Sequence, residues 1–518
     1  MNINRRNFLI GGASAFGALG AFGGNRFFAA SGLKDRGRPK LRFGVISDTH
    51  VQYVGADRKI EEWFNYLTLK HTLEYFREQN VDAVVIAGDL TDYGTITELT
   101  AVSEAWYSVF PDDKYPDGRP VTKVFVTGNH DWEGYLYGKY GEKKYPDPAE
   151  RARNLFQHNL LDFWEKLFHE PYEPIYSKSV NGYTFIGAHW DTGGFGNEKG
   201  RKAYPFRRIK GWMEQNSKKI NPALPFFYVQ HPHPKDTCYG SWAWGHDGGI
   251  TTKTLSAFPN AIAFSGHSHY SLTDERSVWQ GGFTSVGTSS LRYTGRIYNE
   301  LPGAGYENSG VASAKNWRDD AEKMLPPMPS LGNCRQGMLW SVYDDCITVK
   351  RREFLSNLDV GDDWVLPLPA AEPRPFAFAE RAKKREAPRF PDGAKIKVTV
   401  CKRKNRGGKS KDGKEIVPSE VKNAFAVEVP PVVLDVKSRL YSLEFTMQTP
   451  DGKKQVKRIL AKGYNHSVEH PEAKSAQTCV FVKDCPDDAA VKFTVTPMNC
   501  FGERGRELTL TCSATPSV

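Results

Sequence analysis

No stretch of the 518-residue sequence reaches the roughly 18 uninterrupted apolar residues that a membrane-spanning helix requires, and no internal repeat is present. Cysteine is sparse, and none of the eight lies in a C-x-x-C pair. The apolar fraction of 39% and the charged fraction of 25% are those of ordinary globular proteins, which excludes a disordered or collagen-like chain. The length predicts two to four domains.

Acidic residues are absent from the first 30 positions. This segment begins with Arg5-Arg6, continues as a Gly/Ala-rich apolar run to Gly24, and ends in small residues at Ala29-Ala30. The pattern is typical of a twin-arginine signal peptide, which we assign to residues 1–31. The alternative, a helix of the mature fold, is disfavoured because each glycine costs about 1 kcal/mol in a helix. We therefore expect a periplasmic or secreted protein that uses the twin-arginine (Tat) export machinery and has no transmembrane anchor after cleavage.

Two folded parts and a linker follow the signal segment. Residues 40–355 alternate apolar strand-like runs with helical periodicity, which predicts a layered α/β domain. Residues 364–392 are rich in proline and are expected to form a semi-rigid linker. Residues 393–518 contain short alternating runs without helical periodicity, which predicts a small all-β sandwich. Within that part, residues 495–502 resemble the last hairpin of a fibronectin type III-like domain.

The expected elements can be given by their residue ranges. In the α/β domain we expect a helix over 60–77, a closing hairpin from 337–343 and 346–352, and strands at 41–47, 81–87, 121–127, 183–188, 225–230 and 261–265. In the C-terminal domain we expect strands at 395–400, 425–429, 443–448, 479–482 and 491–497.

Five of the apolar runs end in polar residues that can bind metal. These endings are Ser47-Asp48-Thr49-His50, Gly88-Asp89, Gly128-Asn129-His130-Asp131, His231-Pro232-His233 and Gly266-His267-Ser268-His269. Residues two apart on leaving a strand point to the same side, and the carboxyl ends of strands in α/β folds converge on one site. Three Asp or Asn oxygens and four imidazoles exceed what one ion needs. The mixture suits two borderline transition-metal ions such as Fe, Mn, Zn or Co.

The order of these motifs resembles that of the calcineurin-like metallophosphoesterases, and their spacing is closest to the class III cyclic-nucleotide phosphodiesterases. The resemblance covers about residues 40–355 and implies an αββα four-layer sandwich. It also implies two metal ions and hydrolysis of phosphate mono- or diesters through a metal-bridging hydroxide. The metal ligands that it implies, with Asp89 as the bridge, are Asp48, His50, Asp89, Asn129, His231, His267 and His269.

Some roles stay open in the sequence. The resemblance places His130 beside the phosphate, where its imidazole could protonate the leaving oxygen. Asp131 either orients that imidazole or belongs to an exposed turn. His231 is favoured over His233 as the metal ligand because it follows the strand directly, and His233 could instead contact substrate. His189 is expected to be a hydrogen-bonded histidine of the core.

Charge is unevenly distributed along the chain. The formal net charge is +10, but residues 381–470 hold 22 Lys/Arg against 10 Asp/Glu, away from the metal-binding motifs. An alternative is therefore an envelope or anionic-polymer binding protein with a secondary metal site. A nuclease of the same superfamily is a further alternative, disfavoured because basic residues do not cluster at the motifs. We expect a small-molecule or polymer phosphoester as substrate and no stable nucleic-acid partner.

Overall fold

The computed structural model describes residues 36–52, 60–133, 160–190, 206–240, 245–294, 334–355, 357–370, 374–405, 420–435, 437–461, 476–483 and 485–514. The chain divides into two compact units, Met1–Pro39 and Lys40–Val518. The expected signal peptide at residues 1–31 lies outside the described residues. Within the described ranges, no helix is long and apolar enough to cross a membrane.

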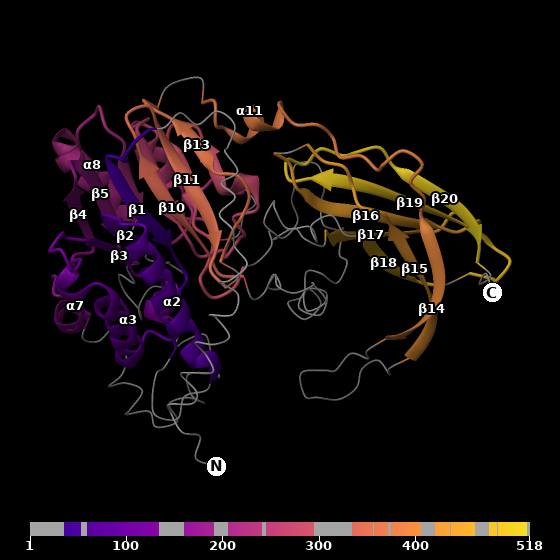
Figure 1. Cartoon of the computed structure of the whole chain (residues 1–518), viewed down its shortest axis with the longest axis horizontal. Coiled ribbons are helices and arrows are strands. Elements are labelled where there is room, and N and C mark those ends of the chain that lie inside the picture. The colour runs from indigo at the N-terminus through magenta and orange to yellow at the C-terminus, as the bar shows by residue number, and fades with distance from the viewer. Residues whose placement is uncertain are drawn as a thin grey trace, which may run out of the picture. The chain divides into compact units, whose positions relative to one another are not determined.

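Seven strands of the N-terminal domain form one mixed sheet (Figure 1). Its order is β12-β11-β10-β1-β2-β3, and β13 also pairs with β11. β1 is parallel to β2 and antiparallel to β10, and β10 and β11 form the expected hairpin. The strands are β1 (Leu41–Ile46), β2 (Ala83–Ala87), β3 (Thr122–Val126), β10 (Gln336–Val342), β11 (Cys346–Glu353), β12 (Leu358–Asp359) and β13 (Trp364–Pro367).

Six further strands form a second sheet with the order β4-β5-β6-β7-β9-β8. β5, β6, β7 and β9 run parallel to one another, and the sequences of β5, β6 and β7 are mostly apolar because both faces of the sheet are covered. The strands are β4 (Ile175–Val180), β5 (Tyr183–Ala188), β6 (Phe226–Val229), β7 (Ala261–Ser265), β8 (Val278–Gln280) and β9 (Thr284–Gly287).

The two sheets face each other across a shared apolar core that contains Phe43, Phe185, Phe227, Phe264 and Trp340. A second core packs α2, α3 and α7 on the outer face of the first sheet, and a third packs α8 and α9 on the outer face of the second. This confirms the expected αββα sandwich. The helices are α2 (Ile60–Glu78), α3 (Ile96–Val109), α4 (Asn129–Glu133), α7 (Leu160–Phe168), α8 (Phe206–Asn216) and α9 (Ile250–Leu255).

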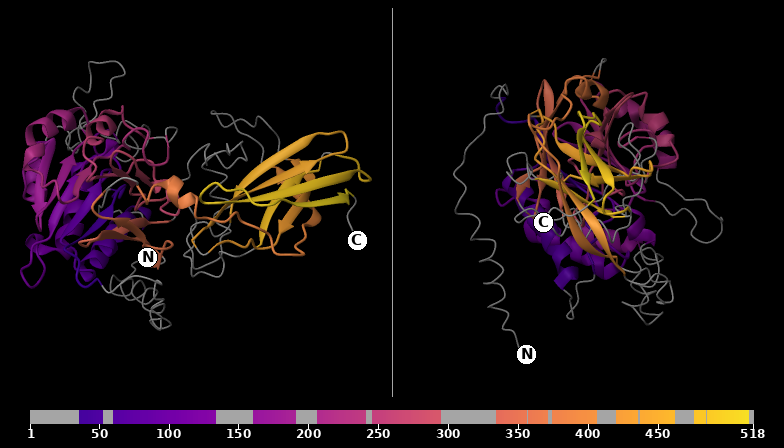
Figure 2. Two further views of the ribbon diagram at one scale, coloured as in Figure 1. Left: turned by 90° about the horizontal axis from the view of Figure 1, so that it is seen from above. Right: turned by 90° about the vertical axis from the view of Figure 1, so that its right-hand side faces the viewer.

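The C-terminal domain is an all-β sandwich, as expected, with a three-stranded sheet β14-β15-β18 and a four-stranded sheet β17-β16-β19-β20 (Figure 2). Both sheets contribute to one core, in which Phe425 and Phe493 are in ring contact. The strands are β14 (Lys397–Asn405), β15 (Glu420–Val429), β16 (Leu440–Gln448), β17 (Lys454–Leu460), β18 (Gln477–Val482), β19 (Ala490–Asn499) and β20 (Leu508–Ser513).

The segment that we expected to be a linker, residues 364–392, has more structure than its prolines suggest. Its first four residues form β13, because Trp364 and Leu366 are buried in the core between the two sheets. Further on lies the short helix α11 (Phe378–Ala382). Arg381 of α11 pairs with Glu275, a buried residue of the N-terminal domain. The buried side chains of Trp364 and Leu366 and the ion pair of Arg381 therefore attach β13 and α11 to the N-terminal domain.

Candidate metal centre

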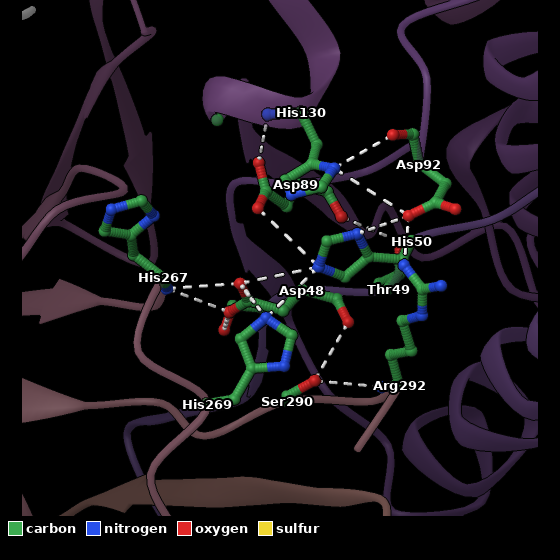
Figure 3. A network of polar contacts seen from close by, with 12 residues as sticks. Asp48, Thr49, His50, Asp89, Asp92, His130, His267, His269, Ser290 and Arg292 are labelled. Carbon is green, nitrogen blue, oxygen red and sulfur yellow. Dashed lines mark hydrogen bonds and ion pairs between the residues drawn. The ribbon is translucent and has the colours of Figure 1, made fainter. Parts of the chain in front are cut away.

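The five motifs meet at the carboxyl ends of parallel strands of the two sheets. Asp48 and His50 follow β1, Asp89 follows β2, and Asn129 follows β3. On the second sheet His231 follows β6, while His267 and His269 follow β7. Because the sheets face each other, these loops approach from both sides of one site, where α/β folds place their ligands (Figure 3).

Four side chains form a first group of converging ligand atoms, namely Asp48, His50, Asp89 and His269. The Nε2 atom of His269 lies 3.1 Å from Oδ1 of Asp48. The Nε2 atom of His50 lies 3.2 Å from Nε2 of His269 and 3.6 Å from Oδ2 of Asp89. All four side chains are buried. Imidazole nitrogens that converge on carboxylate oxygens in this way are a donor set for a borderline divalent cation.

Asp89 also belongs to a second group with His231 and His267. Its Oδ2 lies 3.1 Å from Nε2 of His231, and that nitrogen is 3.1 Å from Nδ1 of His267. Asn129 is 4% exposed, and its Oδ1 has no hydrogen-bond partner among the residues that the structure describes. A buried amide oxygen without a partner is costly, so Asn129 fits the role of a further cation ligand. The carboxylate of Asp89 is thus shared by two groups of ligands.

Backbone conformation presents these ligands at some energetic cost. Five residues of the site have positive φ although they are not glycine, namely Asp48, His50, Asp89, His267 and His269. The left-handed conformation costs roughly 1–2 kcal/mol per residue. The flanking Gly128 and Gly266 leave the space that the ligands occupy, because a Cβ atom at these positions would lie 2.2 Å from Oδ1 of Asp89 and 2.4 Å from Oδ2 of Asp48, respectively. Strained backbone of this kind is typical of functional sites.

The imidazoles and carboxylates of the site alter one another's pKa values. Burial would raise the pKa of Asp48, but His269 and His231 lower it to about 2. Burial likewise opposes ionisation of Asp89, whose pKa is held well below its ordinary range by His231 and His130. Burial lowers the pKa of His50 to about 4, which favours the neutral imidazole that binds metal. The site therefore combines carboxylates that stay ionised at neutral pH with a neutral imidazole.

Contacts behind the ligands orient three of the imidazoles. Nδ1 of His231 is 2.8 Å from the carbonyl oxygen of Ala87, and Nδ1 of His269 is 3.1 Å from that of Tyr293. Nδ1 of His50 is 3.2 Å from a carboxylate oxygen of Asp92. In each ring the Nε2 atom is left facing the ligand cluster. Such partners fix the ring orientation and the tautomer of metal-binding histidines.

Asp92 and Arg292 are site residues that the sequence analysis missed. Asp92 is buried, forms an ion pair with Arg292, and contacts His50. Its carbonyl oxygen lies 2.9 Å from Nδ1 of His130, and its Oδ1 is 3.8 Å from the same nitrogen. Burial opposes ionisation of Asp92, but Arg292 and His50 outweigh it and lower its pKa. Neither residue carried a sequence signal, because Asp92 lies in the loop between β2 and α3 and Arg292 lies in the loop after β9, where periodicity gives no information.

The expected role of Asp131 is wrong on both readings. Its carboxylate is buried and accepts hydrogen bonds from the backbone of Leu90, Thr91 and Gly128 and from the Thr91 hydroxyl. It therefore joins the loop after β2 to the loop after β3 and is not part of an exposed turn. The His130 imidazole contacts Asp92 instead, with Nδ1 2.9 Å from the carbonyl oxygen of Asp92, while the backbone N–H of His130 donates to Oδ1 of Asp89 at 2.8 Å.

His231 and His233 end in different surroundings. His231 lies in the ligand cluster, whereas the buried His233 lies between the hydroxyls of Ser265 and Ser268, at 2.7 and 2.6 Å. Burial lowers the pKa of His233 to about 3, so it is a neutral core residue that supports the loop between His267 and His269. His189 is buried, and its Nδ1 accepts a hydrogen bond from the backbone of Thr127, which confirms its expected place in the core.

Comparison with known proteins defines the class of this domain. Residues 41–271 match the family model described as calcineurin-like phosphoesterase. These residues contain all seven of the expected metal ligands. The N-terminal domain is therefore of the metal-dependent phosphoester hydrolase class. Within that class, the matched segment is similar to the calcineurin-like phosphoesterases.

Individual relatives are distant. A probable cyclic nucleotide phosphodiesterase from Vesicomyosocius okutanii is 26% identical over 121 residues, which cover 23% of this chain and 41% of the relative. The similarity thus spans less than half of that protein. Solved structures with a similarity include a dimetal phosphatase from Danio rerio, at 12% identity over 63% of this chain and 99% of that one, with a TM-score of 0.34. Another is a purple acid phosphatase from yellow lupin, at 14% identity over 63% of this chain and 53% of that one, with a TM-score of 0.36.

Proposed function

We propose that this protein is an exported phosphoesterase that uses two metal ions to hydrolyse phosphate mono- or diesters. The observation that carries the proposal is the position of Asp89. Its Oδ2 lies 3.1 Å from His231 in one group of ligands and 3.6 Å from His50 in the other. A carboxylate shared by two such groups suits a pair of ions rather than one.

The ions would be held by Asp48, His50, Asp89 and His269 on one side, and by Asp89, Asn129, His231 and His267 on the other. Bound there, borderline ions such as Fe, Mn, Zn or Co supply Lewis acidity for the attacking water and the phosphoryl oxygens. The chain itself places His130, whose side chain is 29% exposed, in ring contact with His50 of the first ligand group. Its imidazole is oriented by the Asp92 carbonyl and can donate a proton to the leaving oxygen.

The test combines metal analysis with turnover. We expect the purified protein to contain close to two transition-metal ions. It should hydrolyse p-nitrophenyl phosphate, bis(p-nitrophenyl) phosphate or a cyclic nucleotide when supplied with Mn, Fe or Zn. The cyclic nucleotide is included because the relative from Vesicomyosocius okutanii is named for that activity. Absence of metal, together with no turnover on any of these substrates after metal addition, would contradict the proposal.

Export and the identity of the second domain are further parts of the proposal. The paired Arg5-Arg6 and the Gly/Ala-rich run after it support transport by the twin-arginine machinery to the periplasm or beyond. The division into three and four antiparallel strands supports a fibronectin type III-like sandwich for residues 393–518. Fractionation of cells expressing the full chain and an Arg5→Lys/Arg6→Lys variant tests export, since the variant should stay unprocessed in the cytoplasm.

A further inference from the structure

The hydroxyl of Ser47 contacts a candidate metal ligand. Ser47 belongs to the strand ending Ser47-Asp48-Thr49-His50 but is not one of the candidate ligands, and its side chain is buried. Its Oγ lies 2.5 Å from Oδ2 of Asp48 and 2.9 Å from the carbonyl oxygen of Ser289. The hydroxyl of Thr288 donates a hydrogen bond to the same Oγ at 2.7 Å. Ser47 therefore connects the loop after β9 to the carboxylate of Asp48.

The two carboxylate oxygens of Asp48 have different neighbours. Oδ1 lies 3.1 Å from Nε2 of His269 and 3.9 Å from Nε2 of His50 (Figure 3). The Nε2 atom of His231 lies 4.0 Å from the same oxygen. Oδ2 is the oxygen that accepts the hydrogen bond from Ser47. Because the imidazole nitrogens of the site converge on Oδ1, this oxygen is the one placed to bind an ion.

The backbone by itself does not select an oxygen of Asp48. In Asp89 the backbone N–H of His130 donates to Oδ1 at 2.8 Å, and Oδ2 faces imidazoles of both ligand groups. In Asp48 the backbone N–H of His267 is almost equally far from both oxygens, at 3.1 Å from Oδ2 and 3.2 Å from Oδ1. An amide shared in this way does not fix which oxygen faces the ligand cluster. The hydroxyl of Ser47 contacts Oδ2 and so distinguishes the two oxygens.

The hydrogen of the Ser47 hydroxyl has two acceptors within reach. A serine hydroxyl has one O–H, so Ser47 donates either to Asp48 or to the carbonyl oxygen of Ser289. The carboxylate is the nearer acceptor, and a hydrogen bond to a carboxylate is about twice as strong as one to a neutral group. Ser47 and Asp48 are both 0% exposed, so water does not compete for this hydrogen. The hydrogen therefore lies toward Asp48.

We propose that Ser47 is a positioning residue, which holds Oδ2 of Asp48 and so presents Oδ1 as the one oxygen that this carboxylate gives to the ion of the first ligand group. The inference rests on the proposed function, because it requires that the ligand groups bind ions. A carboxylate held in this way need not rotate when the ion binds, so the hydroxyl raises metal affinity. A hydroxyl bonded only to Ser289 would leave metal affinity unchanged.

The experiment measures the metal affinity of Ser47→Ala and Ser47→Thr in the full-length protein. Ser103→Ala is the matched control, because the hydroxyl of Ser103 in α3 also donates one hydrogen bond, to the carbonyl oxygen of Leu167 in α7 at 2.7 Å. Each protein is freed of metal with a chelator and titrated with Zn²⁺ or Mn²⁺ by calorimetry. Thermal unfolding of the apo forms and turnover of the substrates named above are measured on the same samples.

Partners behind metal ligands are worth about 10- to 100-fold in metal affinity. We expect Ser47→Ala to weaken one ion by this factor and the other by less than about 3-fold, because Asp48 belongs to the first ligand group alone. Ser47→Thr keeps the hydroxyl and should stay within about 3-fold of the wild type for both ions. Ser103→Ala should bind both ions as the wild type does. The two alanine variants should lose a similar amount of apo Tm, since each loses one buried hydrogen bond.

Equal metal affinity of Ser47→Ala and the wild type would overturn the inference. An equal loss in Ser103→Ala or in Ser47→Thr would do the same. Should Ser47→Ala fail to fold, Thr288→Val decides, because it removes the hydroxyl that holds Ser47 and is expected to weaken one ion by about 3-fold or more. Unchanged affinities in Thr288→Val would then overturn the inference.

The wild type separates this inference from the proposed function. If it binds two ions and turns over none of the substrates, the proposed hydrolysis fails, and the titrations still decide the role of Ser47. If it binds no ion, both the proposed function and the inference are overturned.

Discussion

Replacement of His231 and of His233 by alanine should have opposite consequences, although the two residues are separated by a single proline. His231 lies in the ligand group that includes Asp89 and His267. Even a partner behind a metal ligand is worth about 10- to 100-fold in metal affinity, so loss of a ligand should cost at least that much. His231→Ala should therefore keep one ion and lose the other at equimolar supply.

His233→Ala should retain both ions and lose stability instead. The imidazole makes buried hydrogen bonds to Ser265 and Ser268, each worth about 1 kcal/mol, and a weaker one to Sγ of Cys238, and its removal leaves a cavity. The total is about 3 kcal/mol. At about 2 °C per kcal/mol for a large domain, Tm should fall by about 6 °C. Contact between His233 and substrate, which the sequence left open, is not expected because the ring is buried.

The assay is titration of each apo variant with Mn or Zn by calorimetry, followed by thermal unfolding at saturating metal. His233→Gln is the matched control, because its amide can keep one of the two hydrogen bonds and should recover part of the lost Tm. The reasoning is refuted if His233→Ala loses an ion while His231→Ala keeps two.

Further predictions concern the shared carboxylate Asp89, the proposed proton donor His130 and the buried ion pairs of Glu275. Asp89→Asn should lose both ions and nearly all turnover, measured by elemental analysis and rate, since one carboxylate serves both ligand groups. His130→Ala should keep the metal content and lower kcat by about 10²- to 10⁴-fold, because its backbone contact to Asp89 survives the substitution; a loss of metal would count against this role. Glu275→Gln should lower the free energy of unfolding by about 3–5 kcal/mol at pH 7, because it removes the buried charge that pairs with Arg351 and Arg381. Burial would raise the pKa of Glu275, but the two arginines hold it below 4.5, so its stabilisation is complete above that pH and is lost as the pH falls further. Urea unfolding of wild type and Glu275→Gln from pH 7 to 3 should show the gap closing at the acidic end; a constant gap would contradict the assignment.

Much of the N-terminal domain could be predicted because apolar runs and helical periodicity in the sequence coincide with the observed strands and helices. Strands such as β5 and β7 coincide with apolar runs, and helix α2 ends one residue beyond its expected end. In the C-terminal domain, β17 and β20 were missed. The residues of β20 alternate between half-buried and exposed along its length, and β17 carries Lys454, Lys457 and Arg458 among its seven residues, so neither has a continuous apolar run.

The side chains that converge in the candidate metal centre could be picked out from the sequence because each lies within a few residues of the end of a strand and carries a chemically distinctive group. The surroundings of the ligands could not. Asp92 and Arg292 are 200 positions apart in the sequence, and their ion pair exists only because the loop after β9 of one sheet lies against the loop after β2 of the other. The same packing gives Asp131 four donors from two loops and turns it away from His130.

The sequence by itself therefore determined the strands that precede the metal-binding motifs, the candidate ligand side chains and the class of chemistry, since these depend on residue type and on spacing within a few positions. The tertiary structure decided which imidazole faces the ligand cluster and which faces the core, as His231 and His233 illustrate. It also decided that the guanidinium of Arg292 pairs with Asp92. These properties follow from the contact of two sheets across one core, and that contact is set by the packing of residues far apart in the chain.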